Sequence, residues 1–170
     1  MKKSVALTTL AATIVWVTSV HIEWVAHDNG HLMVIDGQSF DVMGEVSEYW
    51  NRTTRQCHQV RHVSPKEYIH TQVLAVIKDY SPPQSRMAHV VSLWTAGDWL
   101  LAEVEFKELF PAVVLIKQSV PSLTVVPRGV WSGVTKPWKA IPKIRHYLSA
   151  QVPEAPVDLL RCFELQSVAF

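Results

Sequence analysis

Cysteine, glycine and net charge are all scarce in this chain of 170 residues. Its two cysteines cannot supply the four thiolates of a structural zinc site or a disulfide-dense scaffold. Sixteen basic and fifteen acidic residues leave a net charge of +1. Because a protein that grips nucleic-acid phosphates normally has a larger basic excess, we expect no nucleic-acid partner.

The motifs of several common enzyme classes are also missing. The six glycines form neither a Walker A sequence nor a Gly-x-Gly-x-x-Gly fingerprint, which argues against a nucleotide enzyme. No Gly-x-Ser-x-Gly elbow is present, and His89, Ser92 and Asp98 show no spacing typical of a hydrolase. We therefore predict no catalytic residue and no cofactor.

Histidines offer the alternative of a metal-dependent or hydrolytic enzyme. His58 and His62 lie four residues apart on an expected helix, a spacing that a metal ion can use, but no third ligand stands beside them. His21-x-Glu23 resembles part of a zinc deaminase motif without its Pro-Cys-x-x-Cys partner. We predict no metal site and keep the enzyme as the second hypothesis.

The composition indicates a folded and exported domain. Hydrophobic residues make up 48% of the chain and charged residues 18%, which argues against disorder. Lys2 and Lys3 precede an uncharged run from Ser4 to Ser19, as in an export signal. The run also continues far enough for a retained membrane anchor over residues 4–26, and an ordinary buried N-terminal element is the third reading.

Both the signal and the anchor place residues 28–170 outside the cytoplasm, because the two lysines stay inside. We expect a periplasmic domain, free or anchored to the inner membrane. Such an oxidising compartment favours a disulfide between Cys57 and Cys162, and two separate buried thiols are the alternative.

Apolar spacing and turn residues predict the order of the elements. Asp36-Gly37 joins two strand-like runs in a hairpin over 32–42. Ser64 and Glu67 form a capping box that starts a helix. The expected helices cover residues 45–61, 64–80, 98–110, 141–148 and part of the tail 153–170; the expected strands cover 87–94, 112–116, 120–126 and 130–134, with a turn at 127–129.

The second half of this order resembles the thioredoxin fold. His89-Val90-Val91-Ser92-Leu93-Trp94 is similar to its central strand, Val120-Pro121-Ser122-Leu123 to its Val-Pro-Thr segment, and residues 130–148 to its closing hairpin and helix. The resemblance implies an α/β fold, with a thioredoxin-like central sheet flanked by helices and an N-terminal hairpin and helix extension. It also implies a cis peptide bond before Pro121. The expected divisions are a signal peptide or anchor over 1–27, the hairpin and helix over 28–62, and the thioredoxin-like domain over 63–170.

This sequence lacks the cysteine pair on which the redox chemistry of the thioredoxin family depends. The position of its Cys-x-x-Cys pair corresponds here to Gly97-Asp98-Trp99-Leu100-Leu101, and thiol–disulfide exchange needs a thiolate. By analogy we expect a redox-inactive binding or assembly module of a bacterial envelope complex, such as a secretion or conjugation apparatus. Its partners would be envelope proteins, and residues 4–26 could add membrane association.

Two of the tryptophans indicate a candidate protein-binding surface. Trp50, Trp94 and Trp99 fit core positions, whereas Trp131 and Trp138 flank a loop marked by glycine and proline. Exposed tryptophan is enriched at binding hot spots. Lys139 and Arg145 belong to a basic patch beside Trp138, so we predict an interface of Trp131, Trp138, Lys139 and Arg145. A solvated helix face is the alternative reading of that patch.

Overall fold

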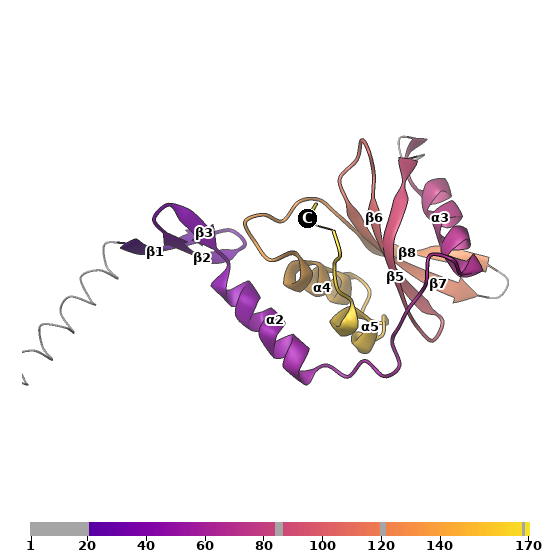
Figure 1. Ribbon diagram of the computed structural model, residues 1–170, viewed down its shortest axis with the longest axis horizontal. Helices are drawn as coiled ribbons and strands as arrows, with labels where there is room; N and C mark the ends of the chain where they lie inside the picture. The colour runs from indigo at the N-terminus through magenta and orange to yellow at the C-terminus, as the bar shows by residue number, and fades with distance from the viewer. Residues whose placement is uncertain (1–20, 84–86, 120–121, 168) are drawn as a thin grey trace, which may run out of the picture. The chain divides into compact units, whose positions relative to one another are not determined.

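The computed structural model describes residues 21–83, 87–119, 122–167 and 169–170, and the chain divides into two units at Val46 and Ser47 (Figure 1). Each unit is described by itself. Pro121 and the run Ser4–Ser19 lie outside the described residues. Within the described part of the chain, no helix has the length and apolar character needed to cross a membrane.

The first unit contains a three-stranded antiparallel sheet in the order β1-β2-β3, formed by β1 (Ile22–His27), β2 (Gly30–Ile35) and β3 (Gln38–Phe40). Ile35 pairs with Gln38, so Asp36 and Gly37 form a two-residue loop with φ of 48° and 80°. Both angles are positive, as this hairpin type requires. The predicted hairpin is confirmed. Residues 22–26, which the anchor reading included, belong to β1.

The helix after this hairpin is α2 (Val42–Thr54). At its start, the Asp41 carboxylate accepts a hydrogen bond from the Gly44 N–H at 2.8 Å. It ends seven residues before the predicted position 61. His58 therefore lies in a turn and His62 in the short strand β4 (Arg61–His62). The predicted placement of both histidines on one helix face is wrong.

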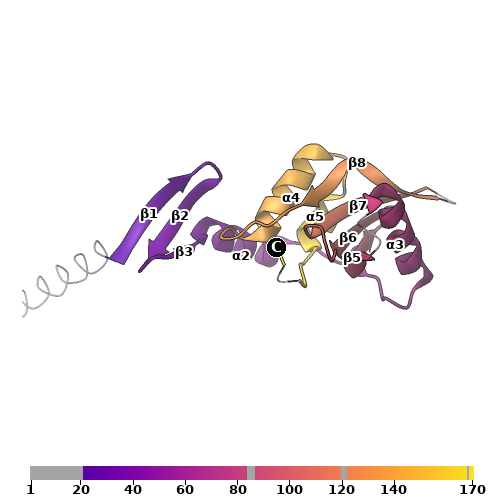
Figure 2. The ribbon, with the colours of Figure 1, turned by 90° about the horizontal axis from the view of Figure 1, so that it is seen from above.

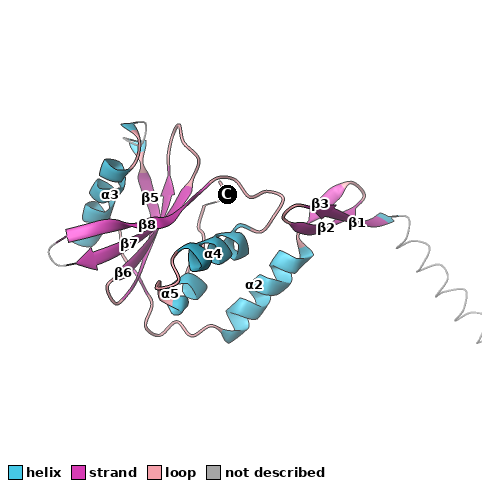
Figure 3. Ribbon diagram, turned by 180° about the vertical axis from the view of Figure 1, so that it is seen from behind, coloured by secondary structure: helices cyan, strands magenta, loops and turns pink. Residues whose placement is uncertain are grey.

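The second unit is built on a five-stranded, wholly antiparallel sheet. Its order is β4-β5-β6-β7-β8, with β5 (His89–Ala96), β6 (Trp99–Glu105), β7 (Ala112–Ser119) and β8 (Ser122–Ser132). Figures 1 and 3 show α3 (Tyr68–Tyr80) on one side of the sheet, and α4 (Ala140–Gln151) and α5 (Val157–Cys162) on the other. The predicted α/β class, with a central sheet flanked by helices, is confirmed.

The start of α3 follows its sequence signal. A Glu67 carboxylate oxygen accepts a hydrogen bond from the Ser64 N–H at 2.8 Å, which is the predicted capping contact. The same carboxylate accepts two bonds from Arg61, at 2.8 and 2.9 Å. Hydrogen bonding to Arg61 and then to Ser64 holds the pKa of Glu67 below its usual value of 4.5. The regular helix begins at Tyr68, just after this turn.

The helix predicted over residues 98–110 is wrong. Ala96 pairs with Trp99, so Gly97 and Asp98 form a tight turn that leads straight into β6. The apolar residues at helical spacing misled the prediction because β6 is buried on both of its faces. A strand buried on both faces shows no alternation of apolar and polar residues, and such a run can also match a helical spacing.

The turn predicted at 127–129 is a bulge inside one long strand, β8, which Figure 2 shows running along the edge of the sheet. Pairing with β7 shifts between Val114 and Ile116, and Arg128 takes a φ of 64° to absorb the extra residues. A Cβ atom on Gly129 would lie 2.9 Å from the Leu115 Cβ. The glycine is therefore required for close packing of β8 on β7.

The observed connections differ from those that carried the thioredoxin resemblance. Strands β5 to β8 follow one another as an antiparallel meander, without the helix expected between the first two strands. The position compared with the redox pair is consequently a hairpin turn rather than a helix start. The X-Pro bond found in the cis form is Lys136–Pro137.

Alternation along the central strands creates two separate cores. Trp99, Leu101, Val113 and Leu115 face α4 and α5, where they pack with Ile144, Leu148 and Leu159. Leu100, Ala102, Val114 and Ile116 face α3, where they pack with Val73 and Ile77. We call these two sides of the sheet the α4/α5 face and the α3 face.

Candidate binding site

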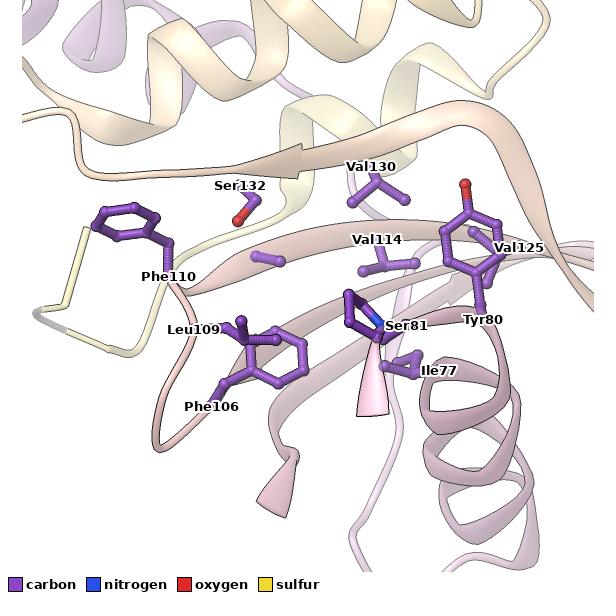
Figure 4. Close-up of a pocket in the computed structure, with 12 residues that line it drawn as sticks. Ile77, Tyr80, Ser81, Phe106, Leu109, Phe110, Val114, Val125, Val130 and Ser132 are labelled. Carbon is purple, nitrogen blue, oxygen red and sulfur yellow. The ribbon is translucent and has the colours of Figure 1, made fainter. Parts of the chain in front are cut away.

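The α3 face contains an apolar pocket of about 280 Å³. It lies where the end of α3 meets the loop that joins β6 to β7, over strands β7 and β8 (Figure 4). Its lining consists of Ile77, Tyr80, Ser81, Pro82, Phe106, Leu109, Phe110, Ala112, Val114, Val125, Val130 and Ser132. We call it the α3-face pocket.

Two short segments build the two walls of this pocket. Ile77, Tyr80 and Ser81 come from the end of α3, and Phe106, Leu109 and Phe110 come from the β6–β7 loop. Helix α3 ends there because its C-cap, Ser81, is extended and is followed by two prolines, which cannot continue a helix. The aliphatic floor comes from the α3-facing residues of β7 and β8.

The rim of the pocket carries large aromatic groups in contact with solvent. Tyr80 is 59% exposed and Phe110 is 66% exposed. Ser81, Ser132 and the Tyr80 hydroxyl are its polar side-chain groups. A pocket of this kind favours burial of apolar groups and supplies few polar contacts that would orient a polar substrate.

The helices on the α4/α5 face are fastened by the cysteine pair and by polar contacts, and in this sense we call it the closed face. Cys57 and Cys162 lie at disulfide distance, with their sulfur atoms 1.93 Å apart, as predicted. Next to them the Asn51 amide donates to the Arg161 carbonyl at 2.8 Å, and the Arg161 guanidinium donates back to Asn51 at 3.1 Å. Arg55 forms an ion pair with Glu164. These contacts bind α2 to α5 and the tail.

A buried carboxylate fastens the C-terminal segment to the same face. Glu103 on β6 is fully buried, and its oxygens accept hydrogen bonds from the backbone N–H groups of Gln166 and Ser167 at 2.9 and 2.8 Å. The Ser92 hydroxyl donates a third bond at 2.9 Å. Three donors replace the water that the carboxylate loses on burial, so Glu103 has a structural role.

The residues of the predicted interface lie at separate places. Trp131 packs against Phe170, with ring centroids 5.6 Å apart, so the tail covers it. Trp138 is half-buried under the Lys143 ammonium, and Lys139 is exposed just before α4. Arg145 is only 16% exposed and pairs with Glu48 at 3.1 Å. Their role in an interface stays a prediction.

The three tryptophans predicted to lie in the core divide into one buried residue, one half-buried residue that packs against the core, and one exposed residue. Trp99 is 5% exposed, as predicted, whereas Trp50 is 68% exposed. Trp94 is half-buried and packs edge-on against His62, with ring centroids 5.1 Å apart. Glu48 and Asn51 form the buried side of α2 in this unit, which leaves Trp50 on the outside. The prediction failed because it took the apolar side of this helix as its buried side.

The chemistry-bearing clusters considered in the sequence are dispersed. No three metal-binding side chains gather anywhere in residues 21–83, 87–119, 122–167 and 169–170. The Ser92 hydroxyl donates a hydrogen bond to Glu103. Asp98, in the β5–β6 turn, forms an ion pair with Lys117 of β7 at 3.4 Å.

Sequence reasoning missed the α3-face pocket, because it placed Phe106, Leu109 and Phe110 on a helix. The available signal was Gly97-Asp98 between two apolar runs, which favours a two-residue hairpin. Fold and site together define an α/β domain whose α3 face carries an apolar pocket with an aromatic rim. Family models, curated proteins and solved structures give no match to this chain.

Proposed function

We propose that this protein is an exported binding module of a bacterial envelope complex, and that its α3-face pocket takes apolar side chains of a partner protein. The observation that carries the proposal is the combination of an apolar lining with exposed aromatic residues on the rim. Aromatic side chains that are exposed beside a pocket are typical anchors of protein interfaces.

The dimensions of the pocket support a protein side chain over a small polar substrate. Its volume of about 280 Å³ is just below the range of roughly 300 to 1,000 Å³ that is common for small-molecule sites. The lining supplies two serines and one tyrosine hydroxyl and contains no charged side chain, so it offers little to orient a polar substrate. One or two aliphatic or aromatic side chains fit this character.

The cysteine pair and the N-terminal sequence support the location. A disulfide is stable outside the cytoplasm, and Cys57 and Cys162 lie at the distance that such a bond requires. The basic start and apolar run of residues 1–19 are typical of an export signal.

Photo-crosslinking in the native envelope tests the proposal. A photoreactive phenylalanine analogue replaces Phe110 in the full chain, and a second, control chain carries it at Gln151, an exposed position on the opposite face. Each chain is also prepared with Ser132→Phe, which fills the pocket from an exposed lining position. Thr124→Phe, at an exposed position of β8 outside the lining, is the matched control.

We expect a discrete protein adduct from position 110 that Ser132→Phe removes and Thr124→Phe preserves. Peptide mapping should place the crosslink on an apolar side chain of the partner. An adduct that survives Ser132→Phe, or one that forms equally from position 151, would show that the pocket is not the binding site.

A further inference from the structure

A second cavity, of about 320 Å³, lies on the opposite side of the second unit, between α4 and α5. Its lining is apolar except for two arginines and one serine: Arg145, Ser149, Val152, Pro153, Ala155, Val157, Leu160 and Arg161. We call it the arginine cavity. Its volume is enough for a small ligand with an apolar body.

Arginines outnumber carboxylates in the ion-pair cluster beside this cavity. Glu48 pairs with both Arg52 and Arg145, at 3.3 and 3.1 Å, and Glu164 pairs with Arg55. Arg161 has polar but uncharged partners: its guanidinium donates to Asn51 and to the Thr54 hydroxyl. Three guanidiniums therefore pair with two carboxylates, and the fourth, that of Arg161, donates to uncharged groups.

The arginines that line the cavity also retain free donors. Arg145 uses Nε for the Leu160 carbonyl, at 3.1 Å, and Nη2 for Glu48. Arg161 uses Nε and Nη2 for Asn51 and Thr54. Among the residues that the structure describes, Nη1 of each arginine has no protein acceptor and is open to solvent. Two guanidiniums offering unused N–H groups in one apolar cavity match a carboxylate, which accepts several charge-assisted hydrogen bonds.

The electrostatic environment of Arg145 favours binding of an anion. Burial lowers the pKa of Arg145, Glu48 partly offsets this effect, and the charges of Arg161 and Arg55 lower the pKa further. Guanidiniums that repel one another in a partly desolvated site gain from an added negative charge.

We propose that the arginine cavity binds a small amphipathic carboxylate, with the carboxylate at Arg145 and Arg161 and the apolar chain along Val152, Pro153 and Val157. This site is separate from the α3-face pocket, on the other side of the sheet. The apolar walls exclude a purely polar anion as the best ligand, because such an anion would leave them exposed to water.

Calorimetric titration of the full chain with octanoate tests the proposal. Octanol, which has the alkyl chain but no charge, and acetate, which has the charge but no long alkyl chain, are the comparison ligands. We expect saturable binding of one octanoate per chain. Binding of octanol and of acetate should be at least about tenfold weaker, because each lacks either the charge-assisted hydrogen bonds or the buried chain.

Val157→Glu and Val157→Gln form the matched pair of variants. Val157 is 65% exposed and lines the cavity, so both substitutions should preserve the fold. The new carboxylate should compete for the guanidiniums and weaken octanoate binding at least about tenfold, whereas the amide should change it less than about threefold. Arg161→Gln should abolish binding, and Arg161→Lys should restore part of it.

The proposal is overturned if octanoate does not bind, or if octanol or acetate binds as tightly as octanoate. Equal octanoate affinity of the two Val157 variants also overturns it. If Arg161→Gln fails to fold, the Val157 pair still decides the outcome, because neither of its members removes an existing ion pair.

Discussion

The two faces of the five-stranded sheet are covered in different ways. On the α4/α5 face, two helices and the tail are fastened by the cysteine pair, the Asn51–Arg161 contacts and the Glu103 carboxylate. On the α3 face, a single helix covers the sheet and ends at Tyr80, beside the α3-face pocket. One face is thus fixed covalently and by buried polar contacts, and the other exposes apolar surface.

This difference indicates a division of labour between stability and binding. Buried polar contacts and crosslinks make the closed face costly to open. The open face keeps apolar groups in water, which lowers the solubility of a free domain unless a partner covers them. Substitutions on the closed face should therefore change the free energy of unfolding, and those on the α3-face rim should change binding.

The largest expected effect comes from the cysteine pair. The combined variant Cys57→Ser and Cys162→Ser should lower the free energy of unfolding by about 4–5 kcal/mol, because the pair closes a loop of roughly 100 residues. Urea unfolding of the oxidised protein and the variant measures the difference. A loss below about 1 kcal/mol would contradict a covalently fixed closed face.

Glu103→Ala should have the next largest effect. It leaves the Ser92 hydroxyl and the N–H groups of Gln166 and Ser167 without their buried acceptor, at a cost of about 3 kcal/mol. Glu108→Ala, at an exposed loop position, is the control and should change the free energy by less than about 0.5 kcal/mol. Equal effects of the two substitutions would show that Glu103 does not fasten the tail.

Gly129→Ala should destabilise the protein by about 1–3 kcal/mol through overpacking. The added Cβ would lie 2.9 Å from the Leu115 Cβ and 3.0 Å from the Val126 carbonyl oxygen, so the bulge of β8 would have to shift. Thermal unfolding compares it with Gly97→Asn, at a turn where a Cβ meets nothing within 4 Å. Asparagine tolerates the positive φ of Gly97, and this control should stay within about 0.5 kcal/mol.

Substitutions on the pocket rim should have the smallest effect on stability. Phe110→Ser and Tyr80→Ser remove side chains that are mostly in water, so each should change the free energy of unfolding by less than about 1 kcal/mol. Both should nevertheless reduce partner capture. A loss of several kcal/mol from Phe110→Ser would show that the β6–β7 loop is part of the closed core.

The sequence predicted the elements that local chemistry determines. Asp36-Gly37 placed the N-terminal hairpin, and Ser64 with Glu67 marked the turn that starts α3. Two buried strands, two C-terminal helices and the proximity of the cysteines were also predicted. The predicted elements each depend on a few neighbouring residues. The cysteine pairing was predicted from the expected export of the chain.

The errors arose where tertiary contacts override local pattern. Strand β6 is buried on both faces, so its apolar residues matched a helix equally well. Glu103 fell within the helix predicted over 98–110, and only the returning tail shows why a carboxylate is buried at this position. The pocket combines residues from α3, the β6–β7 loop and β8, a set that no spacing along the chain connects.

Titration of the full chain with the neutral dye N-phenyl-1-naphthylamine tests the open α3 face most directly. We predict saturable fluorescence enhancement at one dye per chain, which Ser132→Phe removes and Thr124→Phe retains. The account is contradicted if the dye does not saturate a site, or if Ser132→Phe binds it as well as the unmodified protein does.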